Sequence, residues 1–546
     1  MKGKQAVIEA LRREGVRYVF GNPGTSEMPI LAALSAAPDL RYVLATQEGV
    51  AVGMADGYAR SSGQPAFVLL HRDTGLANGI SLLINSCHGG TPVVLSAVNT
   101  DQRKLLEGRV DLTRMVGQFT KWSLEVTRPE LVSAAFRRAF EEALRPPAGP
   151  VFISLAFDVL DAEFEPSATP GGRTWAAMRP DEDAIEAAAN LLVSSSKTLL
   201  LLGDRVTEEG AFEEALRLAE LLACDVHSAH PSEVNFPTGH PLFRGSMPAL
   251  LPEERGALAD GTTVVAVGTS VFGGFFYLPG ALSPGARLIH LDSSLPEIGK
   301  CEPTEIGIPG NLRAGLAALR SALETFLRQR GVRPPGPWPR RPPVAARPVP
   351  SGESEDGKTP MSADTLMREL ARVLPRHAIV VEDAGTAAGA LHRALEFNAP
   401  GSLHGVRGGA IGWGMGAALG VRLARPDRPV VCLLGDGTAM MTIQALWTAA
   451  RENLRVVYVI CNNASYRVLR LNAAVYRRTV PGTRFDPAEN AVTELSPPID
   501  FARTAVGLGV RGQRIEAHRE VGPAIEQALA YDGPSLLDVI IDGVRP

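Results

Sequence analysis

The stretch that decides the fold is residues 429–469, PVVCLLGDGTAMMTIQALWTAARENLRVVYVICNNASYRVL. Its two apolar runs, residues 430–434 and 456–460, are typical of buried strands, and residues 442–453 between them have helical spacing. A strand–helix–strand unit of this kind makes the two strands parallel. The stretch therefore predicts an α/β fold with a parallel sheet.

Polar residues follow both strands of this unit. Asp436 comes after the first strand and Asn463 after the second. Neighbouring strands lie about 4.8 Å apart, so the two side chains are expected together at the carboxyl end of the sheet, where open α/β sheets bind ligands. A carboxylate and an amide oxygen suit Mg²⁺ or Ca²⁺, and Gly435 and Gly437 let backbone approach a phosphate. The residues predict a metal-bridged diphosphate site, although Gly-Asp-Gly alone also suits a strand-end turn.

The full pattern of GDG, a helix, an apolar strand and NN resembles the thiamine-diphosphate fingerprint of the 2-oxo-acid decarboxylase and acetohydroxyacid synthase superfamily. Within it, the chain is most similar to the benzoylformate decarboxylases. The resemblance implies that Asp436, Asn463 and the main-chain carbonyl of Ser465 bind the metal ion. It further implies that the diphosphate is held by Gly385, Thr386, Gly437, Thr438 and Tyr466.

A second motif set lies near the N-terminus. Glu48 opens a small-residue helix, GVAVGMADGYAR, directly after an expected strand at residues 41–46. Read from the residues alone, Glu48 is either a first-turn carboxylate facing the helix dipole or a catalytic acid. The superfamily has a glutamate here that bonds N1′ of the cofactor's aminopyrimidine and promotes proton removal from C2 of the thiazolium. The resemblance therefore implies that Glu48 is catalytic.

The resemblance also implies a substrate pocket. The turn GNPGTS faces the active site in the family, which puts Thr25 beside the substrate as a further catalytic residue. His71 matches a histidine that faces the substrate and assists proton transfer, with a hydrogen-bonded strand-end histidine as the alternative. The pocket positions implied are Asn22, Thr25, His71, Phe275, Arg467, Val468 and Asn472.

One pocket position departs from the benzoylformate decarboxylase pattern. Phe275 stands where those enzymes carry a second histidine, and a phenyl ring cannot transfer a proton. Either another group does so, or protonation of the bound product is not the normal outcome. Arg467 is either solvated or, if it points inward, favours a substrate with an extra anionic group.

The stretch GGAIG at residues 408–412 aligns with the segment beneath the cofactor in the family. The resemblance implies that Ile411 is the apolar wedge that bends the cofactor and that the carbonyl of Gly409 accepts from N4′. An ordinary core position is the alternative for Ile411.

The 546 residues can hold about three domains. Alternating strands and helices predict three doubly wound parallel-sheet domains. We expect a pyrimidine-binding domain with the catalytic glutamate at 1–165, a central domain at 166–330, a Pro/Arg-rich linker at 331–360, and a diphosphate- and metal-binding domain at 361–546. No GxGxxG follows a strand of the central domain, so we expect neither FAD nor another nucleotide there.

Composition excludes several classes of partner. The net charge of -4 gives no basis for binding nucleic acid or an anionic membrane. No run of 18 or more apolar residues predicts a membrane span, and the N-terminal amphipathic helix has no signal core. Five scattered cysteines without a CxxC pair indicate reduced thiols and a cytoplasmic protein.

The resemblance implies a thiamine-diphosphate-dependent lyase that converts a small-molecule 2-oxo acid to an aldehyde and CO₂. A carboligase (a transferase) of the acetolactate-synthase or aldehyde-lyase type, using an aldehyde or other carbonyl acceptor, is the alternative. A third possibility is a cofactor-binding protein without turnover, against which Glu48 argues. Family active sites lie at a dimer interface, so we expect a homodimer or homotetramer in which Glu48 of one subunit serves the cofactor of the other.

Overall fold

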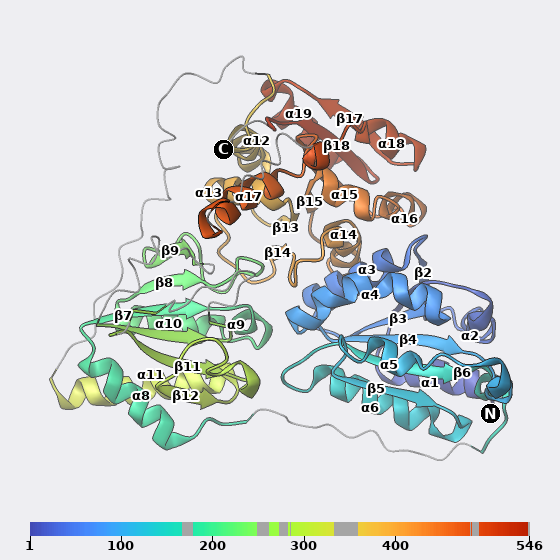
Figure 1. Ribbon diagram of the computed structural model, residues 1–546, viewed down its shortest axis with the longest axis horizontal. Helices are drawn as coiled ribbons and strands as arrows, with labels where there is room; N and C mark the ends of the chain where they lie inside the picture. Colours follow the sequence, from blue (N-terminus) through green and yellow to red (C-terminus); the bar gives the residue numbers. More distant parts are fainter. Residues whose placement is uncertain are drawn as a thin grey trace. The chain divides into compact units, whose positions relative to one another are not determined.

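The computed structural model describes residues 1–165, 178–247, 261–271, 282–283, 285–331, 359–480, 482 and 491–543 (Figure 1). The chain forms two compact units: residues 1–173, 348–395 and 404–546 make the first, and residues 174–347 with 396–403 make the second. Three six-stranded parallel sheets with flanking helices confirm the predicted fold class. The predicted linker at 331–360 lies almost entirely outside the described residues, so the domain boundaries stay predictions.

The N-terminal sheet has the order β2-β1-β3-β4-β6-β5. Its strands are β1 Tyr18–Asn22, β2 Arg41–Leu44, β3 Ala66–His71, β4 Val93–Asn99, β5 Trp122–Val126 and β6 Val151–Ala156. Its helices are α1 Gly3–Arg13, α2 Met28–Leu34, α3 Glu48–Ser62, α4 Arg72–Gly89, α5 Leu112–Val116, α6 Val132–Leu144 and α7 Phe157–Asp161. The central strands are buried on both faces because helices cover them on both sides.

The C-terminal sheet, in the same compact unit, has the order β14-β13-β15-β16-β18-β17. Its strands are β13 Ile379–Asp383, β14 Leu403–Gly405, β15 Val430–Gly435, β16 Val456–Asn462, β17 Arg511–Ile515 and β18 Ser535–Ile540. Its helices are α12 Ala363–Val373, α13 Ala388–Ala394, α14 Trp413–Ala424, α15 Asp436–Met441, α16 Ala445–Arg451, α17 Arg467–Thr479, α18 Phe501–Gly507 and α19 His518–Ala530.

The central sheet, which belongs to the second unit, has the order β12-β11-β10-β7-β8-β9. Its strands are β7 Lys197–Leu202, β8 Asp225–Ser228, β9 Phe243–Ser246, β10 Thr262–Val267, β11 Arg287–Asp292 and β12 Ile306–Pro309. Its helices are α8 Glu182–Ser194, α9 Arg205–Glu208, α10 Phe212–Leu222 and α11 Leu312–Gln329.

The crossover between β15 and β16 differs from the single helix predicted at residues 442–453. Helix α15 begins already at Asp436, and a break at Thr442, with φ -144°, separates it from α16. The hydroxyl of Thr442 donates to the carbonyl of Gly412 at 2.5 Å. The Thr442 side chain is thus bonded to the segment before α14 and not to the preceding turn of α15, and the helix is interrupted at this residue.

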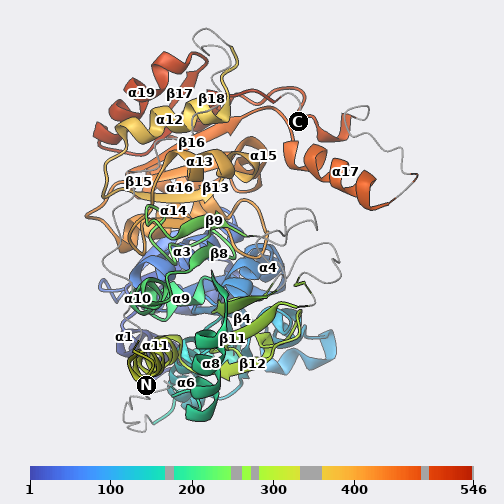
Figure 2. The same cartoon turned by 90° about the vertical axis from the view of Figure 1, so that its left-hand side faces the viewer.

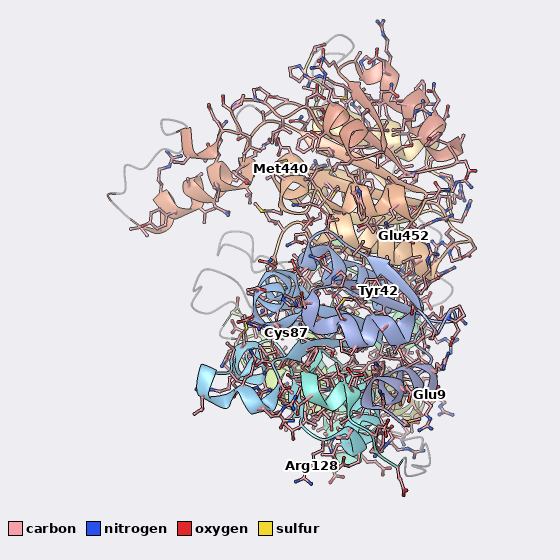
Figure 3. All side chains as sticks on the ribbon, turned by 90° about the vertical axis from the view of Figure 1, so that its right-hand side faces the viewer. Glu9, Tyr42, Cys87, Arg128, Met440 and Glu452 are labelled. Carbon is pink, nitrogen blue, oxygen red and sulfur yellow. The ribbon has the colours of Figure 1, made fainter. Side chains whose placement is uncertain are left out.

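Helices α3 and α14 join the N-terminal and C-terminal sheets of the first unit, and Figure 1 shows them side by side. A Cβ at Gly57 would lie 2.2 Å from the carbonyl oxygen of Ala417, and one at Gly420 would lie 1.9 Å from that of Met54. The backbones therefore touch where the helices cross, because these positions lack side chains. Beyond the crossing, Arg41 of β2 pairs with Glu452 just past α16, near the labelled Tyr42 and Glu452 in Figure 3.

Helix α17 extends away from the body of the C-terminal sheet in Figure 2. Its apolar residues Val468, Leu469 and Leu471 are exposed in the single chain. Within the parts of the chain that the structure describes, no helix combines the length and apolar character needed to cross a membrane.

Candidate functional site

The residues expected to bind the metal meet at the carboxyl end of the C-terminal sheet. Gly435 of β15 pairs with Cys461 of β16, which brings Asp436 level with Asn462, the residue before Asn463. The Asp436 Oδ2 accepts from the backbone N–H of Asn463 at 3.1 Å and of Ser465 at 3.2 Å, while Oδ1 accepts from Gly437 at 2.7 Å. Burial raises the pKa of Asp436 against these backbone hydrogen bonds. The structure thus places the predicted ligand residues together.

The same corner fits a hard cation and a diphosphate. Asp436 Oδ1 accepts a single backbone bond and keeps a lone pair for a cation, and carboxylate, amide and carbonyl oxygens are the donors that Mg²⁺ and Ca²⁺ prefer. A Cβ at Gly437 would lie 2.4 Å from Cε1 of Tyr466, so only glycine lets this turn pass the ring. Gly385 has φ +55° and open space around it, and Thr386 follows half-buried. Thr438 is buried in the first turn of α15.

Residues 408–412 form an exposed loop that precedes α14. Gly408, Gly409 and Gly412 all have positive φ, which glycine adopts without strain. The Ile411 side chain is 40% exposed, so the ordinary-core alternative for it is wrong. A protruding isoleucine on a glycine-rich loop is free to contact a ligand.

Two buried acids at the end of β13 lie beneath this loop. Asp383 Oδ2 accepts from the backbone N–H groups of Gly412 and Gly414, both at 3.0 Å, at the start of α14. Burial raises the pKa of Asp383 well above its usual range. Burial also raises the pKa of Glu382 to about 6, although the backbone N–H of Ala384 donates to it. Among the described residues neither acid forms an ion pair, and backbone amides satisfy both.

The carboxylate of Glu48 sits at the first residue of α3, 8% exposed. Its Oε1 accepts from the side-chain amide of Asn22 at 3.1 Å, and its Oε2 accepts from that of Asn78 at 3.1 Å. A Cβ at Gly75 would lie 3.1 Å from Glu48 Oε1 and 3.2 Å from the Cβ of His71. Glu48 and His71 therefore flank one small site on the N-terminal sheet.

His71 is held by a glutamate that the sequence reasoning did not single out. Its Nδ1 lies 2.9 Å from Glu27 Oε2 and 2.9 Å from the hydroxyl of Ser26. Glu27 is fully buried, and it also accepts from Ser26 Oγ at 2.7 Å and from the backbone N–H of Gly24 at 2.9 Å. The strand-end histidine is thus hydrogen-bonded, as one reading predicted, and its side chain stays about one-third exposed.

The other predicted pocket residues are spread over the single chain. Thr25 is exposed at the start of a short 3-10 helix, Thr25–Glu27, while its neighbour Ser26 turns inward to His71. Arg467, Val468 and Asn472 lie on α17, with Val468 and Asn472 exposed. Phe275 lies outside the described residues.

Sequence reasoning missed Glu27, Asn78 and Asn85 as site residues. Asn78 lies on α4, which begins directly after His71, and its amide reaches Glu48. Asn85 forms hydrogen bonds to the backbone of Ala410 through both the nitrogen and the oxygen of its side-chain amide. The two residues are 325 positions apart, so no local sequence pattern predicts this contact.

Comparison with known proteins agrees with this geometry. Three family models of thiamine pyrophosphate enzymes match the chain: the N-terminal TPP binding domain at residues 1–117, the central domain at 185–319 and the C-terminal TPP binding domain at 383–539. The chain belongs to the thiamine pyrophosphate enzyme family, so it is a thiamine-diphosphate-dependent enzyme of the decarboxylase or acetolactate-synthase type.

Relatives from both branches resemble the chain over its whole length. It is 33% identical over 553 residues to benzoylformate decarboxylase of Pseudomonas aeruginosa, covering 99% of each chain. It is also 33% identical over 556 residues, again 99% of each, to a Mycobacterium tuberculosis protein assigned as an acetolactate synthase large subunit. Among solved structures, a thiamine diphosphate-dependent 4-hydroxybenzoylformate decarboxylase of Rhodococcus jostii matches all of both chains at 30% identity and TM-score 0.88.

Proposed function

We propose that this enzyme decarboxylates a 2-oxo acid without oxidation, giving an aldehyde and CO₂. The observation that best supports the proposal is the buried Glu48 carboxylate, held by two amide donors beside His71. Bound thiamine diphosphate would supply a nucleophilic carbon for the 2-oxo group and an electron sink for the loss of CO₂. The protein must orient the reactants and move protons.

The C-terminal sheet is proposed to bind the cofactor's diphosphate through a metal ion. Asp436, Asn463 and the carbonyl of Ser465 would hold Mg²⁺ or Ca²⁺, because all three present hard oxygen donors at one corner. The diphosphate would contact a set of small and hydroxyl-bearing residues: Gly385, Thr386, Gly437, Thr438 and Tyr466. Ile411 and the Gly409 carbonyl would support the cofactor's rings from the exposed loop.

The N-terminal sheet is proposed to handle protons. Glu48 would share a proton with N1′ of the aminopyrimidine, and its two amide partners fix the carboxylate for that contact. His71 would hold or deliver a proton near the reacting carbonyl, oriented by Glu27. Asn22 and Thr25 would line the substrate side of this site.

Carboligation is the second candidate. With the cofactor bound, the substrate carbon would then form its new bond to the carbonyl carbon of an acceptor, such as an aldehyde, instead of taking up a proton. The similarity to an acetolactate synthase subunit at the same identity as to a decarboxylase favours it. Phenylalanine at position 275 is a further reason, because it removes a second proton donor. A cofactor-binding protein without turnover is the third candidate, and the ordered Glu48 carboxylate argues against it.

A complete site is proposed to need two copies of the chain, as a homodimer or homotetramer. In one chain, the loop that carries Ile411 and the neighbouring Met440 and Met441 are exposed apolar surface. Glu48 of the partner subunit would face the cofactor held beside them. Size-exclusion chromatography with light scattering measures this assembly.

The deciding experiment incubates the protein with thiamine diphosphate, Mg²⁺ and a panel of 2-oxo acids, and follows CO₂ and organic products. Aldehyde alone supports the lyase, and hydroxyketone supports the carboligase. Cofactor binding without either product supports the third candidate. Failure to bind thiamine diphosphate would overturn all three.

A second experiment tests the role of Glu48. Glu48→Gln should slow exchange of the cofactor's C2 proton for deuterium about 10²–10⁴-fold, the usual range for losing a positioned acid–base group. NMR of the cofactor signal measures this rate. Glu142→Gln on α6 changes an equally buried glutamate and should leave exchange within about twofold of wild type. Unchanged exchange in Glu48→Gln would remove Glu48 from its proposed role.

A further inference from the structure

Helix α4 holds the loop at residues 408–412 at two places. The side-chain amide of Asn85 donates to the carbonyl of Ala410 at 2.7 Å, and its oxygen accepts from the N–H of Ala410 at 3.0 Å. Three residues earlier, Arg407 donates to the carbonyl of Gly89 at the end of α4 at 2.5 Å. The loop therefore rests on a helix that belongs to the N-terminal sheet.

Asn85 is built for this contact. It is 1% exposed, and both of its polar atoms bond to a single residue, so the pair fixes the orientation of the peptide units on either side of Ala410. A Cβ at Gly408 would lie 3.0 Å from the carbonyl oxygen of Ile84 and 3.1 Å from Asn85 Oδ1, so the loop approaches α4 closely. Two further anchors, Asp383 and Thr442, hold only Gly412 and Gly414, beyond Ile411.

Ala410 lies between the two loop residues proposed to contact the cofactor. A glycine-rich loop with three positive-φ residues has many conformations open to it unless it is tied down. With Asn85 in place, the Gly409 carbonyl and the Ile411 side chain keep one direction before any ligand arrives. Preorganisation of this kind strengthens binding because less order remains to be gained on association.

We infer that Asn85 is a positioning residue for the cofactor, acting through the backbone of Ala410. The inference rests on the proposed function, since that proposal assigns Gly409 and Ile411 to the cofactor. Helix α4 begins directly after His71, and its C-terminal half carries Asn85, which positions the loop at residues 408–412.

The test compares Asn85→Ala with Ser86→Ala. Ser86 is the next residue of α4, fully buried, and it donates to Asp56 at 2.6 Å instead of to the loop. Both variants lose buried hydrogen bonds, so both should melt at lower temperature than wild type without cofactor. Only Asn85→Ala should weaken thiamine diphosphate binding in the presence of Mg²⁺, by about tenfold, measured by isothermal titration calorimetry. That is about 1.4 kcal/mol.

Equal cofactor affinity of Asn85→Ala and wild type, or equal weakening in Ser86→Ala, would overturn the inference. If wild type itself does not bind thiamine diphosphate, the proposed function fails and the inference fails with it. If Asn85→Ala does not fold, hydrogen exchange of the cofactor-free wild type decides: the Ala410 amide should be protected, while exchange at the rate of an open loop would contradict the clamp.

Discussion

The carboxyl ends of the central and C-terminal sheets carry similar acids in opposite settings. In the central sheet, Arg205 donates to the buried Asp292 at 2.7 Å, and Asn235 donates to Asp204 at 3.0 Å. Burial raises the pKa of Asp292, but the neighbouring His290 and the charge and hydrogen bond of Arg205 outweigh burial and leave the pKa lowered. In the C-terminal sheet, burial outweighs the backbone hydrogen bonds of Asp436, so the pKa of Asp436 is raised.

The difference shows which buried acids have no cationic side chain of the chain beside them. Asp292 is neutralised by Arg205, and Asp204 already accepts from the Asn235 side chain, so these two acids offer little to a ligand. Within the part of the chain that the structure describes, Asp436, Glu382 and Asp383 accept hydrogen bonds from backbone N–H groups and form no ion pair. A carboxylate without a charged partner suits a metal ion, which supports the proposed metal site.

The largest expected effect comes from removing the carboxylate of Asp436. Asp436→Asn should weaken thiamine diphosphate binding with Mg²⁺ about 1,000-fold, or about 4 kcal/mol, because it removes the only charged ligand of the proposed metal. Calorimetric titration measures this. The matched change Asp204→Asn on the central sheet should leave affinity within about twofold. Similar losses in both variants would break the comparison.

The next effect tests the neutralised edge. Arg205→Gln should lower the free energy of unfolding by about 3 kcal/mol, because it strands the buried Asp292 charge without its partner. Differential scanning calorimetry should show the loss. The double variant Arg205→Gln/Asp292→Asn should recover much of it. A wild-type melting profile for Arg205→Gln would show that the pair does not neutralise this edge.

Glu382 gives a pH-dependent test of the unneutralised edge. Its pKa of about 6 lies above the ordinary 4.5, so the folded state favours the protonated form. Its contribution to stability is therefore full below about pH 4.5 and is lost as pH rises through about 6, a change of about 2 kcal/mol. Glu382→Gln should melt increasingly above wild type from pH 4.5 to 7. A pH-independent gap in melting temperature would contradict this.

The smallest effect concerns the N-terminal sheet, where the buried Glu27 faces a histidine. Glu27→Gln should lower kcat/KM for the best 2-oxo acid about tenfold, or about 1.4 kcal/mol, because a neutral amide holds the His71 tautomer less firmly. Nitrogen-15 NMR of His71 should show a changed tautomer ratio. Glu27→Asp should restore part of the activity, and an unchanged His71 spectrum in Glu27→Gln would exclude the orienting role.

Much of the fold was predictable because central strands of doubly wound sheets are continuous apolar runs. The edge strands β5, β9, β12, β14 and β17 carry a weaker sequence signal than the central strands. Segments such as FRGS in β9 and RGQRI in β17 are short and polar, since an edge strand is not buried on all sides. The break at Thr442 was equally hidden, because it is tied to a bond with Gly412, 30 residues away.

The candidate site was predictable where its residues follow strands. Asp436 and Asn463 adjoin neighbouring strand ends, so chain order implied that they meet. Glu27 and Asn85 could not be found in this way, because their partners are set by how loops and helices pack. Their own neighbourhoods in the sequence look like ordinary helix or turn segments.

The glycine contacts between α3 and α14 have a consequence for assembly. They pack α3, which begins at Glu48, directly against α14, which follows the loop, within one compact unit. If two copies pair about a twofold axis as proposed, each brings one half of both reaction centres. Docking would then complete the two centres in the same event. Dilution below the dissociation constant of the dimer would then abolish the activity of both centres together, and no species with a single active centre would form.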